Sequence, residues 1–139
     1  MMDVLRANRN SWLALVGYSA FLAVIVVTAN IGGTHTMFGF VADLPAGDKL
    51  CHFAMLGLLA LLADRALGQR SLRPPAASEA APAFALPIGP SVVWILVVAE
   101  EWSQRYLPTR TFDGWDLFAD AVGIVSFTWL GRWLSRSSA

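Results

Sequence analysis

The sequence predicts an all-α polytopic membrane protein, a single domain over residues 1–139 with four transmembrane helices in an antiparallel bundle. Hydrophobic residues make up 56% of the 139 residues and charged residues 14%, whereas a soluble domain usually carries about 25% charged residues. The apolar residues are concentrated in four long runs, separated by segments rich in glycine, proline or charge. A chain with so few charges cannot cover itself with a polar surface, so we expect lipid to surround most of it.

The first span is expected over residues 12–31, where an apolar run follows a short polar start that carries Arg6 and Arg9. Its length is close to the roughly 20 residues that a helix needs to cross the hydrocarbon core. The basic start, the apolar run and the sequence Val27-Thr28-Ala29 also resemble a signal peptide with a cleavage site. The run is long for the apolar region of a signal peptide, which favours a transmembrane helix.

The other three spans are expected over residues 50–67, 83–104 and 117–134. Two prolines fall in the first turns of the third span, where proline is tolerated. The loop 70–82 joins the second and third spans, and its content of proline, alanine and serine predicts a flexible connection on the cytoplasmic side.

The distribution of basic residues orients this bundle, because cytoplasmic loops carry the excess of arginine and lysine. With a cytoplasmic N-terminus, the inner segments hold Arg6, Arg9, Arg65, Arg70, Arg73, Arg132 and Arg136. The outer segments then hold Lys49, Arg105 and Arg110. We therefore expect both termini in the cytoplasm. The aromatic side chains expected in belts at the head-group level are Trp12, Trp102, Tyr106 and Trp115.

Several function classes are disfavoured by composition and motif content. The formal net charge is zero, with ten basic and ten acidic residues, so nothing indicates a nucleic-acid partner. Cys51 is the single cysteine, which excludes an internal disulfide and zinc-finger spacing. The chain has no nucleophile elbow, no HExxH and no P-loop. Whether the protein is an enzyme is therefore left open.

Polar side chains from three predicted helices are expected to meet at the outer face. The second span begins with Asp48, Lys49 and His52; the third ends with Glu100, Glu101 and Gln104; and the fourth begins with Asp113, Asp116 and Asp120. Asp48 and His52 are four residues apart, as are Asp116 and Asp120, so each pair shares one helix face.

Asp120 lies deepest in this set, about 6 Å further along its helix than the preceding aspartate at 1.5 Å per residue. An ionised carboxylate at that depth should not face lipid. We expect it to point into the bundle, toward His52, Lys49 or Arg110. Gly123 continues the same stripe and would let a neighbouring helix approach closely.

The expected protonation of each carboxylate depends on which end of a helix it occupies. The aspartates lie near a helix N-terminus, where negative charge is favoured, whereas the glutamates lie near a C-terminus, where it is not. One glutamate should therefore be more easily protonated than the aspartates. Such a pairing suits general acid–base chemistry, with His52, Glu101 and Asp116 as candidate catalytic residues. A buried structural network would show the same pattern.

The remaining polar residues are candidates for binding a substrate. These are Asp48, Lys49, Gln104, Arg110, Asp113 and Asp120. Lys49 and Arg110 could bind phosphate or carboxylate groups, while Asp113 also suits the N-cap of the fourth helix. A divalent cation is a conceivable cofactor. The residues that would hold it are Asp48, His52, Asp116 and Asp120.

These motifs resemble the VanZ-like family of small membrane proteins. Asp48-Lys49-x-x-His52 is similar to the first motif of that family. Its long second motif is similar to Glu101-x-x-Gln104, Pro108-x-Arg110, Asp113-x-x-Asp116 and Asp120-x-x-Gly123. The family pattern commonly has asparagine at the position of Asp120. The resemblance implies four spans, a place in the bacterial cytoplasmic (inner) membrane, and a link to teicoplanin resistance and cell-envelope polysaccharides.

Three functions are consistent with these patterns. The first is binding of, or catalysis on, the head group of an envelope lipid or lipid-linked glycan in an outer-face polar pocket. The second is an accessory or structural subunit, working with other envelope-biosynthesis proteins, in which the charged network sets helix register. The third is a small transporter or flippase, favoured by an intramembrane carboxylate but disfavoured because the polar groups gather at one face.

Overall fold

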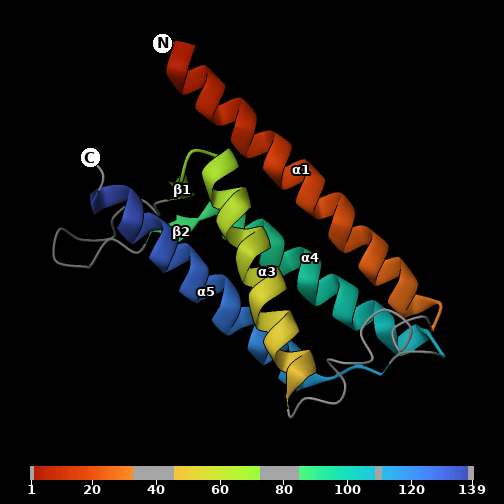
Figure 1. The fold of residues 1–139 in the computed structure, drawn as a ribbon. Helices are drawn as coiled ribbons and strands as arrows, with labels where there is room; N and C mark the ends of the chain where they lie inside the picture. The colour runs from red at the N-terminus through yellow and green to blue at the C-terminus, as the bar shows by residue number, and fades with distance from the viewer. Residues whose placement is uncertain (1, 33–45, 73–84, 109–110, 138–139) are drawn as a thin grey trace, which may run out of the picture.

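The computed structural model describes residues 2–32, 46–72, 85–108 and 111–137, which are mostly helical, as predicted (Figure 1). The long helices in these ranges are α1 (Met2–Asn30), α3 (Gly47–Ala66), α4 (Ile88–Ser103) and α5 (Gly114–Ser137). The short elements are the 3₁₀ helix η1 (Gln104–Tyr106) and the strands β1 (Ser71–Leu72) and β2 (Leu86–Pro87).

α3 and α5 begin within three residues of their predicted starts, whereas α1 and α4 begin further away. α1 begins at Met2 and not near residue 12, since the polar start contains no glycine or proline to interrupt a helix. α4 begins at Ile88, five residues after the predicted start at residue 83. Pro87 is extended there, with φ −63° and ψ 124°, and Leu86 precedes this proline, a position that disfavours the helical region. Leu86 and Pro87, expected in the first turns of this helix, instead form strand β2.

The connection between α3 and α4 contains a short paired segment. Ser71 lies opposite Pro87, and Leu72 lies opposite Leu86, in an antiparallel two-stranded pair. The start of the predicted flexible loop is therefore tied to the start of α4. Residues 73–82 of that loop lie outside the part of the chain that the structure describes.

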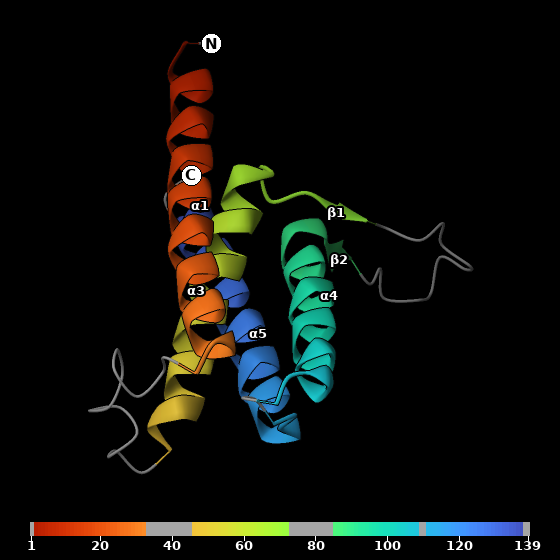
Figure 2. The same ribbon diagram turned by 90° about the vertical axis from the view of Figure 1, so that its right-hand side faces the viewer.

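Consecutive long helices run in opposite directions, as expected for an up-and-down bundle (Figure 1). The most extensive contact, however, joins α3 and α5, which are not consecutive. These two helices lie between α1 on one side and α4 on the other (Figure 2). His52 contacts Asp120, and Asp64 contacts Arg132, and each pair is 68 residues apart in sequence. A constant separation at two levels means that α3 and α5 run parallel and in register.

Glycine allows α3 and α5 to approach closely. A Cβ atom added at Gly57 would lie 2.9 Å from the carbonyl oxygen of Gly123 and 2.6 Å from Cδ2 of Phe127. A Cβ atom added at Gly123 would collide with the carbonyl oxygen of Phe53. The prediction that Gly123 permits close helix packing is confirmed.

The interior of the bundle is small and polar, while its exterior is apolar. The buried hydrophobic cluster consists of Ala60, Ala63, Val93 and Ile124. The largest fully buried side chains are those of Gln104, Glu101, Asp64 and Asp120. Large apolar side chains are exposed on every long helix, for example Phe21, Leu50, Ile95 and Val125.

By length and composition alone, one stretch among the described residues could cross a membrane. It is Arg9–Asn30, with mean hydropathy 2.1 and 6% of its most apolar window buried in the bundle. α3 and α5 carry charged residues near both ends, and α4 has 16 residues. The four-span arrangement is therefore part of the functional proposal below.

The close α3–α5 contact leads to a stability prediction. Gly123→Ala should lower the free energy of unfolding by about 1–3 kcal/mol, because the added methyl group forces two backbones apart. Gly17→Ala is the matched control, since a Cβ atom at Gly17 meets nothing within 4 Å. We expect it to be neutral or stabilising by up to about 1 kcal/mol. Equilibrium unfolding followed by circular dichroism measures both, and equal stability of the two variants would contradict the close packing.

Candidate functional site

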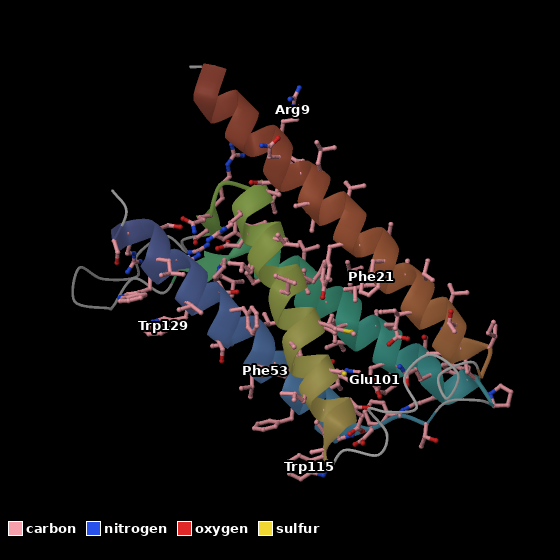
Figure 3. All side chains as sticks on the ribbon, in the orientation of Figure 1. Arg9, Phe21, Phe53, Glu101, Trp115 and Trp129 are labelled. Atoms are coloured by element: carbon pink, nitrogen blue, oxygen red, sulfur yellow. The ribbon has the colours of Figure 1, made fainter. Side chains whose placement is uncertain are left out.

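One end of the bundle gathers most of the polar residues expected at the site. There the N-terminal ends of α3 and α5 meet the C-terminal end of α4 (Figure 1). We use the name polar cluster for Asp48, Lys49, His52, Glu101, Gln104, Asp113, Asp116 and Asp120. Glu101 and Trp115 mark this end in Figure 3, while Trp129 lies toward the other end of α5. Arg110, also expected in the site, lies outside the described residues.

Lys49 joins α3 to the start of α5. Its Nζ donates to Oδ2 of Asp113 at 2.6 Å, to Oδ1 of Asp116 at 2.5 Å and to Oδ2 of Asp48 at 2.8 Å. An ammonium group has three donors, so these contacts use all of them. Lys49 was expected to be available for phosphate, but in the structure it neutralises the aspartates.

His52 and Asp120 form the second pair across the α3–α5 contact. His52 Nδ1 lies 3.1 Å from Oδ1 and 3.3 Å from Oδ2 of Asp120. The Asp120 side chain is 2% exposed and that of His52 is 25% exposed. Asp120 thus points into the bundle, and of the three expected partners it binds His52. The other ring nitrogen, Nε2, lies 3.8 Å from Oδ2 of Asp116, which is too long for a hydrogen bond.

The end of α4 is tied to the start of α5 by Glu101. This buried carboxylate accepts the backbone N–H of Asp113 on Oε1 at 2.7 Å. Asp113 in turn accepts the backbone N–H of Trp115 on Oδ1 at 2.8 Å. Asp113 therefore caps α5, as expected. Gln104, also buried, donates to Oε2 of Glu100 at 2.8 Å.

The charges around Lys49 shift its pKa and those of two exposed partners. The hydrogen bond from Lys49 lowers the pKa of Asp48 and, with the capping contact, the pKa of Asp113. Burial opposes the charged form of Lys49, but its hydrogen bonds to Asp113, Asp116 and Asp48 outweigh burial and raise its pKa. Each group therefore favours its charged form at neutral pH.

The suggested metal ligands are not arranged around a common point. Asp48 and Asp116 both direct an oxygen at Lys49 Nζ, while Asp120 binds the histidine ring. Within the described ranges, no three histidine, cysteine or acidic side chains are placed to hold a metal ion. Lys49 supplies the positive charge at the point where three carboxylates converge.

A hollow on the described surface lies away from the polar cluster. It measures about 490 Å³ and is lined by Trp94, Ile95, Val98, Ala99 and Trp102 on the outer face of α4. At its end, the Arg105 guanidinium stacks over the ring of Trp102 at 3.9 Å. None of the predicted site residues lines this hollow.

A second ionic contact, which the sequence reasoning missed, lies at the opposite end of α3 and α5. Arg132 donates to both oxygens of the buried Asp64 at 2.7 Å, and also to Ser71 Oγ at 2.9 Å. One signal could have found it. Asp64 follows His52 by 12 residues, and Arg132 follows Asp120 by 12 residues. Equal spacing on two helices places each pair at a common level when the helices are parallel.

The pKa shifts around Lys49 predict how stability depends on pH. Asp48 and Asp113 contribute to folding stability above their unfolded-state pKa of about 3.9. This contribution is lost as pH falls through their lowered folded-state pKa values. The contribution of Lys49 is present below about pH 10.4 and is lost as pH rises through its raised folded-state pKa. These three groups therefore add no pH dependence to the melting temperature between these limits.

The substitution Lys49→Met should make the melting temperature depend on pH in the opposite sense on the acid side. Without the ammonium group, three carboxylates repel one another, so the melting temperature of this variant should rise as pH falls from 7 toward 4. Lys49→Arg is the control that keeps the positive charge. Thermal unfolding across a pH series measures all three proteins, and parallel curves for the wild type and Lys49→Met would contradict the assignment.

Comparison with known proteins adds no relationship, because no family model, curated protein or solved structure matches this chain. The geometry of the polar cluster therefore carries the functional interpretation.

Proposed function

We propose that this protein is an integral protein of the bacterial cytoplasmic (inner) membrane whose polar cluster binds the head group of a cell-envelope lipid or lipid-linked glycan. A relationship to the VanZ-like family, which rests on the sequence motifs, is part of the proposal. The observation that carries it is the reversed polarity of the bundle, with carboxylates inside and large apolar side chains outside. In water such a surface would associate or aggregate, whereas lipid can cover it.

The positions of the tryptophans support a membrane-spanning α5. Trp115 is exposed near the polar cluster, and Trp129 is exposed toward the other end of α5 (Figure 3). Trp133, one helical turn further along α5, is also exposed. Trp115 and Trp133 are separated by about 27 Å along the helix axis at 1.5 Å per residue. The hydrocarbon core of a bilayer is about 30 Å thick, and tryptophan is enriched at both of its borders. In this placement the polar cluster lies at the outer border and both termini are cytoplasmic.

The polar cluster is suited to a head group because it is partly accessible from the end of the bundle. The side chains of Asp48 and Asp113 are 62% and 38% exposed, and those of Lys49 and His52 are 29% and 25% exposed. Deeper in the bundle, Glu101 and Asp120 anchor these groups from α4 and α5. A polar ligand at the membrane border could therefore reach the cluster without entering the apolar interior.

A structural role is the second candidate, and one observation favours it. The ammonium group of Lys49 is saturated by three carboxylates, and Asp64 is saturated by Arg132. Such pairs at both ends of α3 and α5 would set helix register in an accessory subunit without any ligand. The two candidates differ in whether the polar cluster binds a head group.

The membrane placement predicts that two positions are exposed on opposite sides of the membrane. Cys51 is the only cysteine, so Cys51→Ser provides a background for Thr111→Cys and Ser137→Cys, both at exposed positions. In spheroplasts, a membrane-impermeant maleimide should label Thr111→Cys at once and Ser137→Cys only after permeabilisation. Simultaneous labelling of both would contradict the placement.

Head-group binding predicts separate effects of two similar substitutions. Asp116→Asn should weaken binding of a short-chain diacylglycerol glycoside or a polyprenyl-diphosphate-linked disaccharide roughly tenfold or more, since hydrogen bonds to charged groups contribute about 1.5–3 kcal/mol. Asp64→Asn is the matched control at the other end of the bundle. It should lower stability but leave the affinity of the folded protein unchanged.

Native mass spectrometry and calorimetric titration of the purified protein measure this binding. If neither probe binds while both substitutions lower stability, the structural role is correct and head-group binding is wrong.

A further inference from the structure

The two ring nitrogens of His52 have different surroundings. Nδ1 lies 3.1 Å from Oδ1 and 3.3 Å from Oδ2 of Asp120. Nε2 makes no hydrogen bond to any residue that the structure describes, and its nearest charged neighbour is Oδ2 of Asp116 at 3.8 Å. One side of the ring is therefore held by Asp120, and the other lies near Asp116.

Asp120 determines which nitrogen carries the proton of a neutral ring. An ionised carboxylate can only accept hydrogen bonds, so the contact with Asp120 requires N–H at Nδ1. Nε2 of the neutral ring then carries a lone pair. This arrangement, a buried carboxylate that orients an imidazole, leaves Nε2 and Asp116 as two acceptors that face each other without a donor between them.

Among the residues that the structure describes, Lys49 and Arg105 already have partners, which disfavours an anionic ligand at His52. All three donors of Lys49 point at carboxylates. The guanidinium group of Arg105 stacks on Trp102 at 3.9 Å and on Phe112 at 4.4 Å. A phosphate that approached His52 would face Asp116 and Asp120, and repulsion would oppose its binding. A group that donates hydrogen bonds and carries no negative charge fits this position.

We propose that Asp120 is a positioning residue that holds His52 with its proton on Nδ1, so that Nε2 and Asp116 accept hydrogen bonds from a hydroxyl-bearing head group such as a sugar. This inference rests on the proposed function and names the chemistry that the same cluster recognises. Within a lipid-linked glycan, the sugar binds here and the phosphate does not.

The protonation of His52 can be observed directly. The chain has two histidines, so ¹⁵N-histidine labelling of the His35→Gln protein reports His52 alone. At about two pH units above the ordinary histidine pKa of about 6.5, the wild-type ring should show N–H coupling at Nδ1 and a bare Nε2. Protonation at Nε2, or on both nitrogens, would overturn the positioning role of Asp120.

Two substitutions separate positioning from general structural support. Asp120→Leu removes the acceptor and should release the ring to a mixture of tautomers. Asp120→Glu keeps a carboxylate, which can only accept the Nδ1 proton, and should restore the wild-type tautomer. If Asp120→Glu and Asp120→Leu gave the same mixture, or if Asp120→Leu kept the wild-type tautomer, the proposed role would be wrong.

Ligand titrations of the same labelled protein test the head-group chemistry. A short-chain diacylglycerol glycoside with a neutral sugar should shift the Nε2 resonance, and Asp120→Leu should weaken its binding about tenfold, the scale of one lost hydrogen-bonding arrangement. Short-chain phosphatidic acid should leave Nε2 unshifted. A shift with phosphatidic acid, or with short-chain phosphatidylethanolamine and not the glycoside, would overturn the hydroxyl assignment.

The failure of this inference can be told apart from failure of the proposed function. Binding of the glycoside without any change at Nε2 would overturn the inference and leave head-group binding in place. If none of these three probes bound, and the polyprenyl-diphosphate-linked disaccharide did not bind either, both would be overturned.

Discussion

The parallel contact between α3 and α5 is the constraint on which the rest of the structure depends. Gly57 and Gly123 allow the two backbones to touch, and this contact brings matching levels of the helices together. His52 consequently meets Asp120 at one end, and Asp64 meets Arg132 at the other. A bulkier residue at the glycine positions would separate all of these pairs at once. The ionic contacts and the helix packing are therefore one feature, and neither would persist without the other.

The reversed polarity of the bundle follows from this close contact. A Gly- and Ala-rich interface leaves little apolar volume to bury, and the interior cluster is correspondingly small. The carboxylates of Glu101, Asp64 and Asp120 occupy interior positions instead, where each has a donor. Buried charge is tolerated when it is paired and hydrogen-bonded. Lipid around the helices would remove the need for a larger apolar core, since the exposed apolar side chains would not face water.

Within the polar cluster, Lys49 and His52 have different consequences for function. Lys49 concentrates three carboxylates that would otherwise repel one another, and in doing so it loses every free donor. Nε2 of His52, beside Asp116, forms no hydrogen bond with any part of the chain that the structure describes. The part of the cluster that can respond to a ligand is therefore the His52–Asp116 side. The Lys49 side supports it by neutralising negative charge.

The sequence by itself determined the helical class and the gathering of polar side chains from three helix ends, and it offered Asp113 as an N-cap, because composition, helical spacing and cap chemistry are local properties. It also indicated Gly123 as a point of close approach. It placed the start of α4 five residues too early, because the extended backbone at Pro87 depends on pairing with β1. Which partner each charged group selects was decided by the tertiary structure. Lys49 pairs with the aspartates, Asp120 pairs with His52, and Asp64 pairs with Arg132, a contact that the sequence reasoning did not predict. These choices depend on α3 and α5 lying parallel in one register, a relation between segments 68 residues apart that no local pattern contains.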